Sequence, residues 1–460
     1  MRPGYDFQGK RVLVVGLART GEVASLFAAG YGAAVTATDE KPENEVAETA
    51  EKLRAAGVKL ELGGHSAETF LEKDLIVLSP GVPANLPALM QARAAGIPVW
   101  SEIELAWRFL RGKLVAITGS NGKTTTTALV AHILKTAGKP TLVGGNIGTP
   151  LLALVESSSD STVTVAELSS FQLETIEAFR PEVGVLLNLT PDHLDRHASF
   201  EEYAAAKMRL FENQLDRDAA VLNADDPEVT KRMPSHQQVF WFSRQKRVAA
   251  GAFLRDGQII FRHDGEEVSV GRRADIALRG EHNVENVLAA CAGAYLAGAE
   301  PGAIASGVRS FRAVEHRLEF VAEIGGVEFF NDSKATNVDA ALKAIEAFPG
   351  PLIVILGGKD KGSPYTPLIE PLRQRARTAI LIGAAAGRIA EDFGDAVPYV
   401  HAETLDRAVQ LAISGAQPGD TVLLAPACSS FDQFENYEHR GRAFKELVRG
   451  LELRYAARKG

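Results

Sequence analysis

A glycine loop near residue 120 combines residue types that bind the phosphates of a nucleotide. Residues 114–127 read LVAITGSNGKTTTT: an apolar run, a loop with two glycines, and a stretch that can start a helix. In such a loop the backbone N–H groups face an anion, Lys123 adds a positive charge near the terminal phosphates, and the Thr124 hydroxyl can bind Mg²⁺. Ile117 stands where the usual phosphate-binding loop has its first glycine, so a tight turn with a chance lysine is the alternative. The pattern predicts a nucleoside triphosphate site made of Gly119, Ser120, Asn121, Gly122, Lys123, Thr124 and Thr125.

A second glycine loop, GLARTG at residues 16–21, follows the apolar run Arg11–Val15. Asp39 ends the next predicted strand, so the segment resembles a dinucleotide-binding fingerprint. Ala18 replaces the second glycine of that fingerprint, which leaves less room for a pyrophosphate. An ordinary strand–helix turn and a diphosphate ligand other than NAD are both open interpretations.

Acidic and histidine side chains follow two later apolar runs. Glu167 ends the run Val163–Glu167, and NLTPDHLDRH (188–197) follows the run that begins at Val183. Strand C-termini of a parallel sheet meet at one edge, where ligands bind, so Glu167 is a candidate Mg²⁺ ligand and His193 a candidate ligand or charge-stabilising group. A buried structural acid is the alternative for Glu167. Lys207, in a helical stretch, reads by itself as one more solvated lysine.

Small and polar residues also follow three apolar runs in the last third of the chain. These segments are NDSKATN (331–337), LGGKDKG (356–362) and APACSSFDQF (425–434). A domain whose strand ends carry such residues can close over a nucleotide bound by its neighbour and exclude water.

Short β-branched runs alternate with Ala-rich amphipathic segments along the whole chain, which is typical of parallel α/β sheets. We expect a three-domain α/β protein: a Rossmann-like domain (1–102), a central P-loop-type mononucleotide-binding domain (103–313) and a Rossmann-like C-terminal domain (314–460). Residues 219–279 are expected to be a small antiparallel extension of the central domain. The predicted strands are Arg11–Val15, Ala34–Thr38, Leu75–Leu78, Ile97–Val99, Leu114–Thr118, Val163–Glu167, Val183–Asn188, Gln258–Arg262, Val327–Asn331, Leu352–Leu356, Ala379–Ile382 and Thr421–Ala425.

Composition excludes several classes of protein. The 460 residues are 46% hydrophobic and 23% charged, unlike a disordered chain, and the net charge is −8 with no long basic tract, so no nucleic-acid partner is expected. Two cysteines 137 residues apart exclude a disulfide framework and favour a reducing cytosol. No signal peptide and no apolar run of 18 residues is found, so no membrane partner is expected.

Taken in order, the motifs resemble those of the Mur ligases over nearly the whole chain, from residue 16 to 441. The matching segments are GLARTG, SPGV, TGSNGKTT, GGNIG, ELSSFQLE, NLTPDHLDRH, AAKMRLFEN, GEHNVEN, EHRLE, NDSKATN, LGGKDKG and APACSSFDQFENYEHRG. Within that family, SSFQLE, NDSKATN and SSFDQF point to members that add D-glutamate. The resemblance implies a cytoplasmic, monomeric, ATP-dependent ligase of peptidoglycan precursor synthesis, and hence of cell-wall biogenesis and cell division. It would join D-glutamate to UDP-N-acetylmuramoyl-L-alanine through an acyl phosphate and a tetrahedral intermediate, giving ADP and phosphate.

The resemblance also assigns roles to individual residues. It implies that Lys123, Glu167, His193 and Lys207 are catalytic, and that Thr124, Glu167, His193 and a carbamylated Lys207 bind two Mg²⁺ ions. Further ATP contacts are Asn286, Arg317 and Asp332. The residues implied to bind the UDP substrate are Thr20, Asp39, Gly81 and Asn146. The residues implied to bind D-glutamate are Thr336, Lys361, Ser430 and Tyr437, although the sequence leaves open whether Lys359 or Lys361 contacts it.

Other functions are less consistent with the sequence. A folylpolyglutamate synthase shares the ligase core, but the first 105 residues would then have no purpose. A nucleotide-gated switch would not need the metal-site acids, and an NAD oxidoreductase lacks the second glycine of its loop. Other Mur ligases, which add L-alanine, a diamino acid or a dipeptide, are the nearest alternative.

Overall fold

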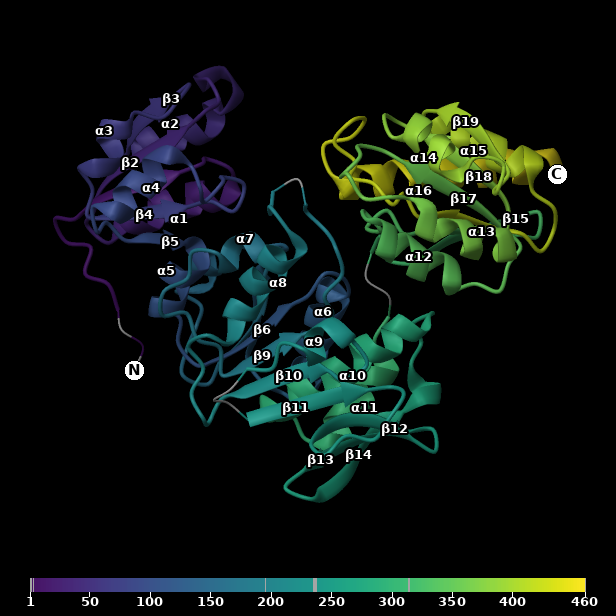
Figure 1. Ribbon diagram of the computed structural model, residues 1–460, viewed down its shortest axis with the longest axis horizontal. Helices are drawn as coiled ribbons and strands as arrows, with labels where there is room; N and C mark the ends of the chain where they lie inside the picture. The colour runs from purple at the N-terminus through teal and green to yellow at the C-terminus, as the bar shows by residue number, and fades with distance from the viewer. Residues whose placement is uncertain (1, 3, 195, 235–237, 313–314, 460) are drawn as a thin grey trace.

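The computed structural model describes residues 2, 4–194, 196–234, 238–312 and 315–459. They form three α/β units, each built on its own sheet and following one another along the chain (Figure 1). The expected α/β class with three sheets is confirmed. The expected boundary at 313–314 lies outside the described residues.

The N-terminal unit is a five-stranded parallel sheet in the order β3-β2-β1-β4-β5. Consecutive apolar residues of its central strands β1 and β4 are buried, as expected when helices cover both faces of a sheet. Its strands are β1 (Arg11–Val15), β2 (Ala34–Asp39), β3 (Lys59–Leu62), β4 (Leu75–Leu78) and β5 (Val99–Ser101), with helices α1 (Arg19–Gly30), α2 (Ala47–Ala55), α3 (Ala67–Leu71) and α4 (Pro87–Ala94). The last strand begins where the predicted strand Ile97–Val99 ends.

The central unit is a nine-stranded sheet in the order β14-β13-β12-β11-β10-β9-β6-β8-β7. Its strands are β6 (Lys113–Thr118), β7 (Thr141–Gly145), β8 (Val163–Glu167), β9 (Val183–Leu186), β10 (Ala219–Asn223), β11 (Gln238–Ser243), β12 (Gly251–Arg255), β13 (Gln258–His263) and β14 (Glu266–Arg272). Its helices are α5 (Glu102–Phe109), which connects it to the first unit, α6 (Lys123–Thr136), α7 (Ser170–Leu173), α8 (Phe200–Met208), α9 (Pro227–Thr230), α10 (Glu281–Leu296) and α11 (Pro301–Ser310).

The antiparallel prediction for residues 219–279 is partly wrong. Strand β10 pairs in parallel with β9 and β11, and β11 pairs in parallel with β12; only β12, β13 and β14 are antiparallel. All five residues of β10 are buried, because α10 packs against this part of the sheet. A continuous apolar run is typical of a parallel strand covered on both faces.

The C-terminal unit is a six-stranded sheet in the order β15-β16-β20-β17-β18-β19, in which only β15 and β16 are antiparallel. Its strands are β15 (Glu319–Ile324), β16 (Val327–Asn331), β17 (Leu352–Gly357), β18 (Ala376–Ile382), β19 (Tyr399–Glu403) and β20 (Thr421–Leu424). Its helices are α12 (Val338–Glu346), α13 (Ile369–Arg375), α14 (Ala386–Phe393), α15 (Leu405–Gly415) and α16 (Tyr437–Lys459).

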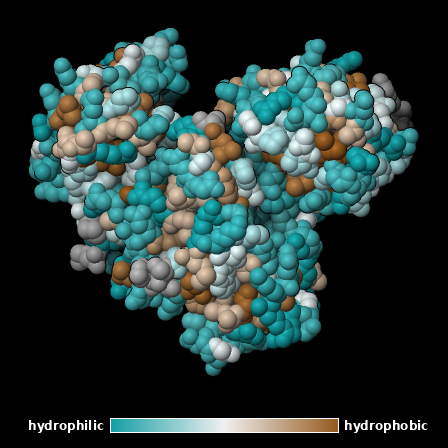
Figure 2. All heavy atoms as spheres, in the orientation of Figure 1, coloured by the Kyte–Doolittle hydropathy of each residue, from teal (hydrophilic) through white to brown (hydrophobic). Residues whose placement is uncertain are grey.

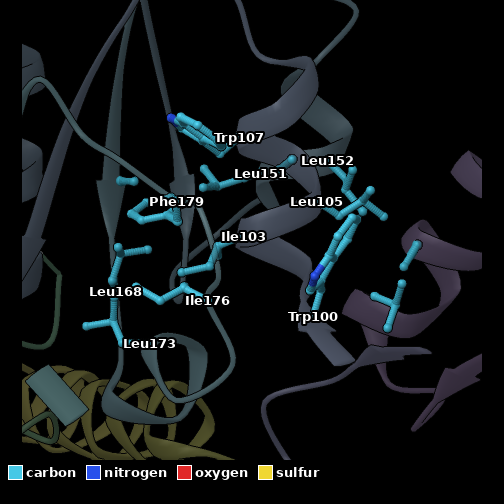
Figure 3. Close-up of a cluster of buried hydrophobic side chains, with 14 of the residues drawn as sticks. Trp100, Ile103, Leu105, Trp107, Leu151, Leu152, Leu168, Leu173, Ile176 and Phe179 are labelled. Atoms are coloured by element: carbon cyan, nitrogen blue, oxygen red, sulfur yellow. The ribbon is translucent and has the colours of Figure 1, made fainter. Parts of the chain in front are cut away.

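The first two units share one buried core, whereas the third has its own. One apolar cluster runs from Phe7 through α5 to Val229, and Figure 3 shows the part where α5 packs against the central unit. The clusters of the last unit contain no described residue of the central sheet. Hydrophilic residues cover most of the face seen in Figure 2, and no described helix is long and apolar enough to cross a membrane.

Candidate active site

The glycine loop joins β6 to the N-terminus of α6, as predicted. Gly122 precedes the helix with φ +85°, and a Cβ there would lie 2.2 Å from Asn286 Oδ1, so both backbone and space require glycine. Asn188 holds the loop from the next strand end by accepting the Asn121 N–H at 2.8 Å. The Lys123 ammonium donates to the carbonyls of Gly119 and Ser120, at 2.8 and 2.9 Å. Burial lowers the Lys123 pKa.

Two side chains predicted to bind metal meet beside this loop. The Thr124 hydroxyl donates to Glu167 Oε2 at 2.8 Å, and Asn146 Nδ2 donates to the other carboxylate oxygen at 3.0 Å. Glu167 is 1% exposed. No group of three His, Cys, Asp or Glu side chains suited to a metal is found in the described part of the chain. A hydroxyl and a carboxylate nevertheless fit Mg²⁺, which keeps several water ligands and takes others from phosphates.

His193 lies at the same sheet edge in a strained conformation, with φ +54°. Its ring packs edge-on against Phe171, with 5.1 Å between centroids, and its Nε2 is 3.7 Å from Asp192 Oδ2. Burial lowers the His193 pKa to about 4. The imidazole is therefore neutral at neutral pH, so it can accept a proton or bind a metal.

Lys207 is buried beneath the glycine loop, which excludes the interpretation as a solvated lysine. Its Nζ donates to Gly119 O at 2.9 Å and lies 4.7 Å from the centre of the Tyr203 ring. Burial lowers its pKa well below the ordinary value, and nearby Lys123 lowers it further. The site favours an uncharged, nucleophilic amine at this position.

A cavity of about 250 Å³ lies between the central and C-terminal units and joins most of these groups. Its lining residues are Ser120, Asn121, Gly122, Lys123, Thr124, Asn146, Ile147, Gly148, Glu167, Asp192, His193, Arg317, Lys334, Thr336, Asn337, Tyr437 and Glu438. Residues from four strand ends of the central sheet, those of β6, β7, β8 and β9, and from the C-terminal unit therefore face one another.

The residues predicted for D-glutamate are only partly brought together. Thr336 and Tyr437 line the cavity, and Lys361 reaches toward it, with its Nζ 3.4 Å from Asp192 Oδ1. Lys359 is exposed and its backbone pairs with Ser429, so Lys361 is the lysine on the cavity side. Ser430 is buried and does not belong to the lining.

The two predicted ATP contacts of the C-terminal unit lie together. Arg317 lines the cavity, and its guanidinium is 3.8 Å from the buried Asp332 carboxylate. Burial raises the Asp332 pKa to about 6, and its Oδ1 has no hydrogen-bond partner among the described residues. The pair is therefore incompletely satisfied, as expected of groups that await a polar ligand.

Arg317 also lines a neighbouring cavity of about 250 Å³ that contains Thr125, Asn283, Phe320 and Phe330. The predicted adenine contact, Asn286, is not in its lining. Instead, Asn286 Nδ2 donates to Asn283 Oδ1 at 3.0 Å and holds that side chain in place.

The polar residues of the site that were not predicted include Asn283, Lys334 and Asn337. Lys334 Nζ donates to the Tyr437 hydroxyl at 2.8 Å, and Asn337 Nδ2 donates to Asp192 Oδ2 at 2.9 Å across the two units. All three lie inside the motifs GEHNVEN and NDSKATN, so motif membership was the available signal.

The four residues predicted to contact the UDP substrate line one cavity of about 490 Å³ beside the N-terminal unit. Its lining includes Thr20, Asp39, Gly81 and Asn146. The Asp39 carboxylate is hydrogen-bonded to the backbone: it accepts the N–H of Leu17 at 2.6 Å and that of Lys41 at 2.9 Å. Asn146 lines this cavity and the one at Lys123, so the two adjoin at that residue.

Three family models match consecutive parts of the chain. The Mur ligase MurD-like N-terminal domain matches residues 10–101, the Mur ligase middle domain residues 117–294, and the Mur ligase glutamate ligase domain residues 316–428.

Two relatives that match over nearly the whole length carry the same name. The UDP-N-acetylmuramoylalanine–D-glutamate ligase of Koribacter versatilis is 55% identical, covering 97% of this chain and 98% of that protein; that of Acidobacterium capsulatum is 54% identical, covering 96% and 97%. The pseudomurein peptide ligase type C of Methanothermus fervidus has a similar fold, with a TM-score of 0.60, 20% identity, and coverage of 96% of this chain and 100% of that chain. From these matches, this chain belongs to the Mur ligase family.

Proposed function

We propose that this protein is the ATP-dependent ligase that joins D-glutamate to UDP-N-acetylmuramoyl-L-alanine in peptidoglycan precursor synthesis. The observation that carries the proposal is that two cavities adjoin at Asn146, one beside the N-terminal glycine loop and one at Lys123. A long substrate held by its UDP end in the first cavity can extend its free carboxylate into the second. The names of relatives about 50% identical over their whole length support the same reaction.

The three units divide the work. Residues 1–102 bind the UDP substrate, residues 103–313 bind ATP, and residues 314–460 bind D-glutamate. All the groups invoked belong to one chain, so the reaction needs no second copy and the proposed enzyme is a monomer. This division assigns the N-terminal cavity a ligand, which a folylpolyglutamate synthase would not supply.

The chemistry follows from the charges around Lys123. A carboxylate resists attack by an amine, so the γ-phosphoryl group of ATP is first transferred to the substrate carboxylate, releasing ADP and forming an acyl phosphate. The amine of D-glutamate then attacks the acyl carbon, and phosphate leaves as the amide forms. Lys123 and the N–H groups of residues 119–125 stabilise the negative charge that builds up on the phosphoryl oxygens.

Mg²⁺ fits the oxygen ligands at Thr124 and Glu167, and when bound it would neutralise phosphate charge and position the reacting oxygens. Two ions are proposed, the second near His193 and Lys207. In the protein alone, Asn146 and Thr124 hold the Glu167 carboxylate in one orientation. His193 is kept neutral by burial, so it does not repel a cation there.

Lys207 is proposed to carry a carbamate. Its uncharged amine can attack CO₂ at carbon, and loss of one proton leaves an N-linked carboxylate that replaces a potential cation with oxygen ligands. The burial that lowers the Lys207 pKa supports this step, because only the unprotonated amine reacts.

The amino-acid pocket is proposed to consist of Thr336, Lys361, Ser430 and Tyr437. Lys361 supplies the charge for a carboxylate, and its Nζ lies 3.4 Å from Asp192 Oδ1 at the edge of the cavity. Arg317 and Asp332 are proposed to contact the ATP phosphates and ribose. Asn286 is proposed to act on adenine through Asn283, which lines the cavity.

The test is a panel of amino acids incubated with ATP, Mg²⁺ and UDP-N-acetylmuramoyl-L-alanine, with phosphate release and amide product both measured. The proposal expects one phosphate per amide with D-glutamate and background release with L-glutamate, L-alanine and diaminopimelate. Equal or faster turnover with another amino acid would assign the protein to a different Mur ligase activity.

A further inference from the structure

The loop that carries His193 contains no helix or strand among its described residues, between the end of β9 at Leu186 and the start of α8 at Phe200. His193 itself has φ +54°, a conformation that is unfavourable for a residue other than glycine. Its side chain is 35% exposed and lines the cavity at Lys123. Irregular loops are more mobile than helices and strands, so the position of this imidazole depends on the side chains that contact it.

One aromatic ring, that of Phe171, contacts three residues of this loop. The centre of the His193 ring lies 5.1 Å from the centre of the Phe171 ring, with 73° between the planes. The His197 ring stacks on Phe171 at 5.4 Å and 10°, and the Arg196 guanidinium lies over the same ring, 4.6 Å from its centre. Aromatic pairs and cation–π contacts have preferred geometries, so together they restrict how the loop can lie.

Phe171 is held in turn by the short helix to which it belongs. α7 begins three residues after Glu167, the proposed ligand of the first Mg²⁺ ion. Reciprocal hydrogen bonds between Ser169 and Gln172 cap its N-terminus. The Phe171 ring is therefore fixed relative to the strand end that carries Glu167.

The other two residues of the loop that contact Phe171 are also anchored. His197 is buried, with its Nε2 3.0 Å from Ser170 Oγ and its Nδ1 3.5 Å from Glu174 Oε1. Arg196 Nη1 donates to the carbonyl of Gly81 in the N-terminal unit, at 3.1 Å. These contacts hold His197 and Arg196 against Phe171, which leaves its ring little freedom to move away from His193.

We propose that Phe171 is a positioning residue for His193, whose ring it holds where the second Mg²⁺ ion is proposed to bind. The inference rests on the proposed function and adds a side chain that acts through His193 and not on the substrate. Mg²⁺ requires near-ideal octahedral geometry, so a displaced ligand binds it poorly. Loss of a group that orients a metal ligand typically lowers metal affinity about 10- to 100-fold.

The test measures Mn²⁺ binding to the full-length protein with a non-hydrolysable ATP analogue, from the electron paramagnetic resonance signal of free Mn²⁺. Two sites are expected in the wild type. Phe171→Leu should weaken one site about tenfold and leave the other within about twofold, whereas Phe171→Tyr, which keeps the ring, should bind as the wild type does. Phe109→Leu is the matched control, because Phe109 is a half-buried ring that packs on Phe7 and Phe27, outside the lining of this cavity.

A double variant shows whether the effect passes through His193. In a His193→Ala background, adding Phe171→Leu should lower the Mn²⁺ affinity no further, because the side chain that Phe171 positions is already absent. A general loosening of the fold would instead add a second loss.

Equal weakening of both sites, a second loss in the double variant, or a lowered unfolding midpoint with unchanged Mn²⁺ affinity would overturn the inference. A single Mn²⁺ site in the wild type would overturn it as well. The measurement needs no turnover, so it is independent of the ligase assay. A selective loss in Phe171→Leu would uphold the positioning role even if the wild-type protein ligates no D-glutamate, a result that would reject the proposed function alone.

Discussion

The two boundaries between the units differ in the contacts that form them: apolar packing at the first and polar hydrogen bonds at the second. At the first, the apolar junction, Trp100, Ile103, Leu105 and Trp107 of β5 and α5 pack among Leu151, Leu152, Leu168, Leu173, Ile176 and Phe179 of the central unit (Figure 3). At the second, the polar junction, the central unit meets the last one through hydrogen bonds such as Asn121 to Asp339 at 2.5 Å and Asn337 to Asp192 at 2.9 Å.

This difference separates a permanent joint from one that can open. Burying apolar side chains contributes about 25 cal/mol per Å², and water cannot replace that contact. A hydrogen bond between the units contributes only about 1 kcal/mol net, because water satisfies the same groups when they part. We therefore expect the apolar junction to fix the cavity beside the N-terminal glycine loop, and the polar junction to open for ATP and the amino acid and then close.

A charged group of the apolar junction is also held rigidly by hydrogen bonds from the backbone. The Glu104 carboxylate is buried and accepts the backbone N–H groups of Glu177, Ala178 and Phe179, at 2.9, 3.0 and 2.7 Å. The corresponding acid of the polar junction, Asp192, faces Asn337 and Lys361 beside a cavity. An acidic side chain thus fastens one junction, whereas an acidic side chain of the other junction can exchange partners with a ligand.

The largest effect is expected from Lys123→Ala at the polar junction. If Lys123 faces the phosphates as proposed, loss of its charge should lower kcat/KM for phosphate release about 10³-fold, with the unfolding midpoint nearly unchanged. Lys135→Ala, at the exposed end of the same helix, is the control. A kcat/KM of Lys123→Ala within threefold of the wild-type value would show that Lys123 does not bind the phosphates.

At the apolar junction, Leu105→Ala should act on stability instead. Leu105 is fully buried, so the cavity left behind should lower the free energy of unfolding by about 3 kcal/mol, measured by urea denaturation. Leu215→Ala, at a site 41% exposed, is the matched control and should change it little. Equal effects of the two variants would show that α5 does not couple the two units.

Asp339→Ala should separate binding from stability at the polar junction. The Asp339 carboxylate accepts from Asn121 and Thr190 of the central unit, so its loss should disfavour the closed arrangement and raise KM for D-glutamate about fivefold. Asp395→Ala, on the exposed surface of the same unit, should leave KM unchanged. A lowered unfolding midpoint without any change in KM would show that Asp339 is structural only.

The smallest effect is expected in the pH dependence at Lys334. Burial lowers the Lys334 pKa to about 8, so the positive charge that faces the cavity is lost as the pH rises through about 8. The KM for ATP should therefore rise a few-fold between about pH 7.5 and 9. The folded state binds fewer protons than the unfolded state between about pH 8 and 10.5, so this group makes stability increase with pH in that window. Lys334→Arg should flatten the KM profile; identical profiles would exclude Lys334 as the cause.

Much of the fold could be predicted because buried strands leave continuous apolar runs. Strands β1, β4 and β8 have the predicted bounds, and each is nearly filled with buried residues. Strands β3 and β7 were missed: KLEL is short and partly exposed, and TLVGG ends in glycines, which lower strand propensity. The parallel pairing of β10 was missed because turn residues nearby suggested hairpins.

Within the site, sequence reasoning succeeded where one motif carries the chemistry. The glycine loop with Lys123, and Glu167 at a strand end, lie where they were expected. Asn283 and Asn286 are one turn apart on α10, so periodicity places both on one face and does not decide which side chain enters the cavity. Contacts such as Asn337 to Asp192 depend on how two units meet, which no local pattern encodes.

The most direct test of this account measures movement at both junctions in one protein. The native cysteines, Cys291 and Cys428, are buried, so spin labels can be attached to Glu51→Cys and Glu201→Cys for the apolar junction, or to Glu201→Cys and Glu391→Cys for the polar junction. With a non-hydrolysable ATP analogue, Mg²⁺ and D-glutamate, the 201–391 distance distribution should narrow and shift, while the 51–201 distribution stays unchanged. A fixed 201–391 distance, or equal shifts at both junctions, would contradict the account.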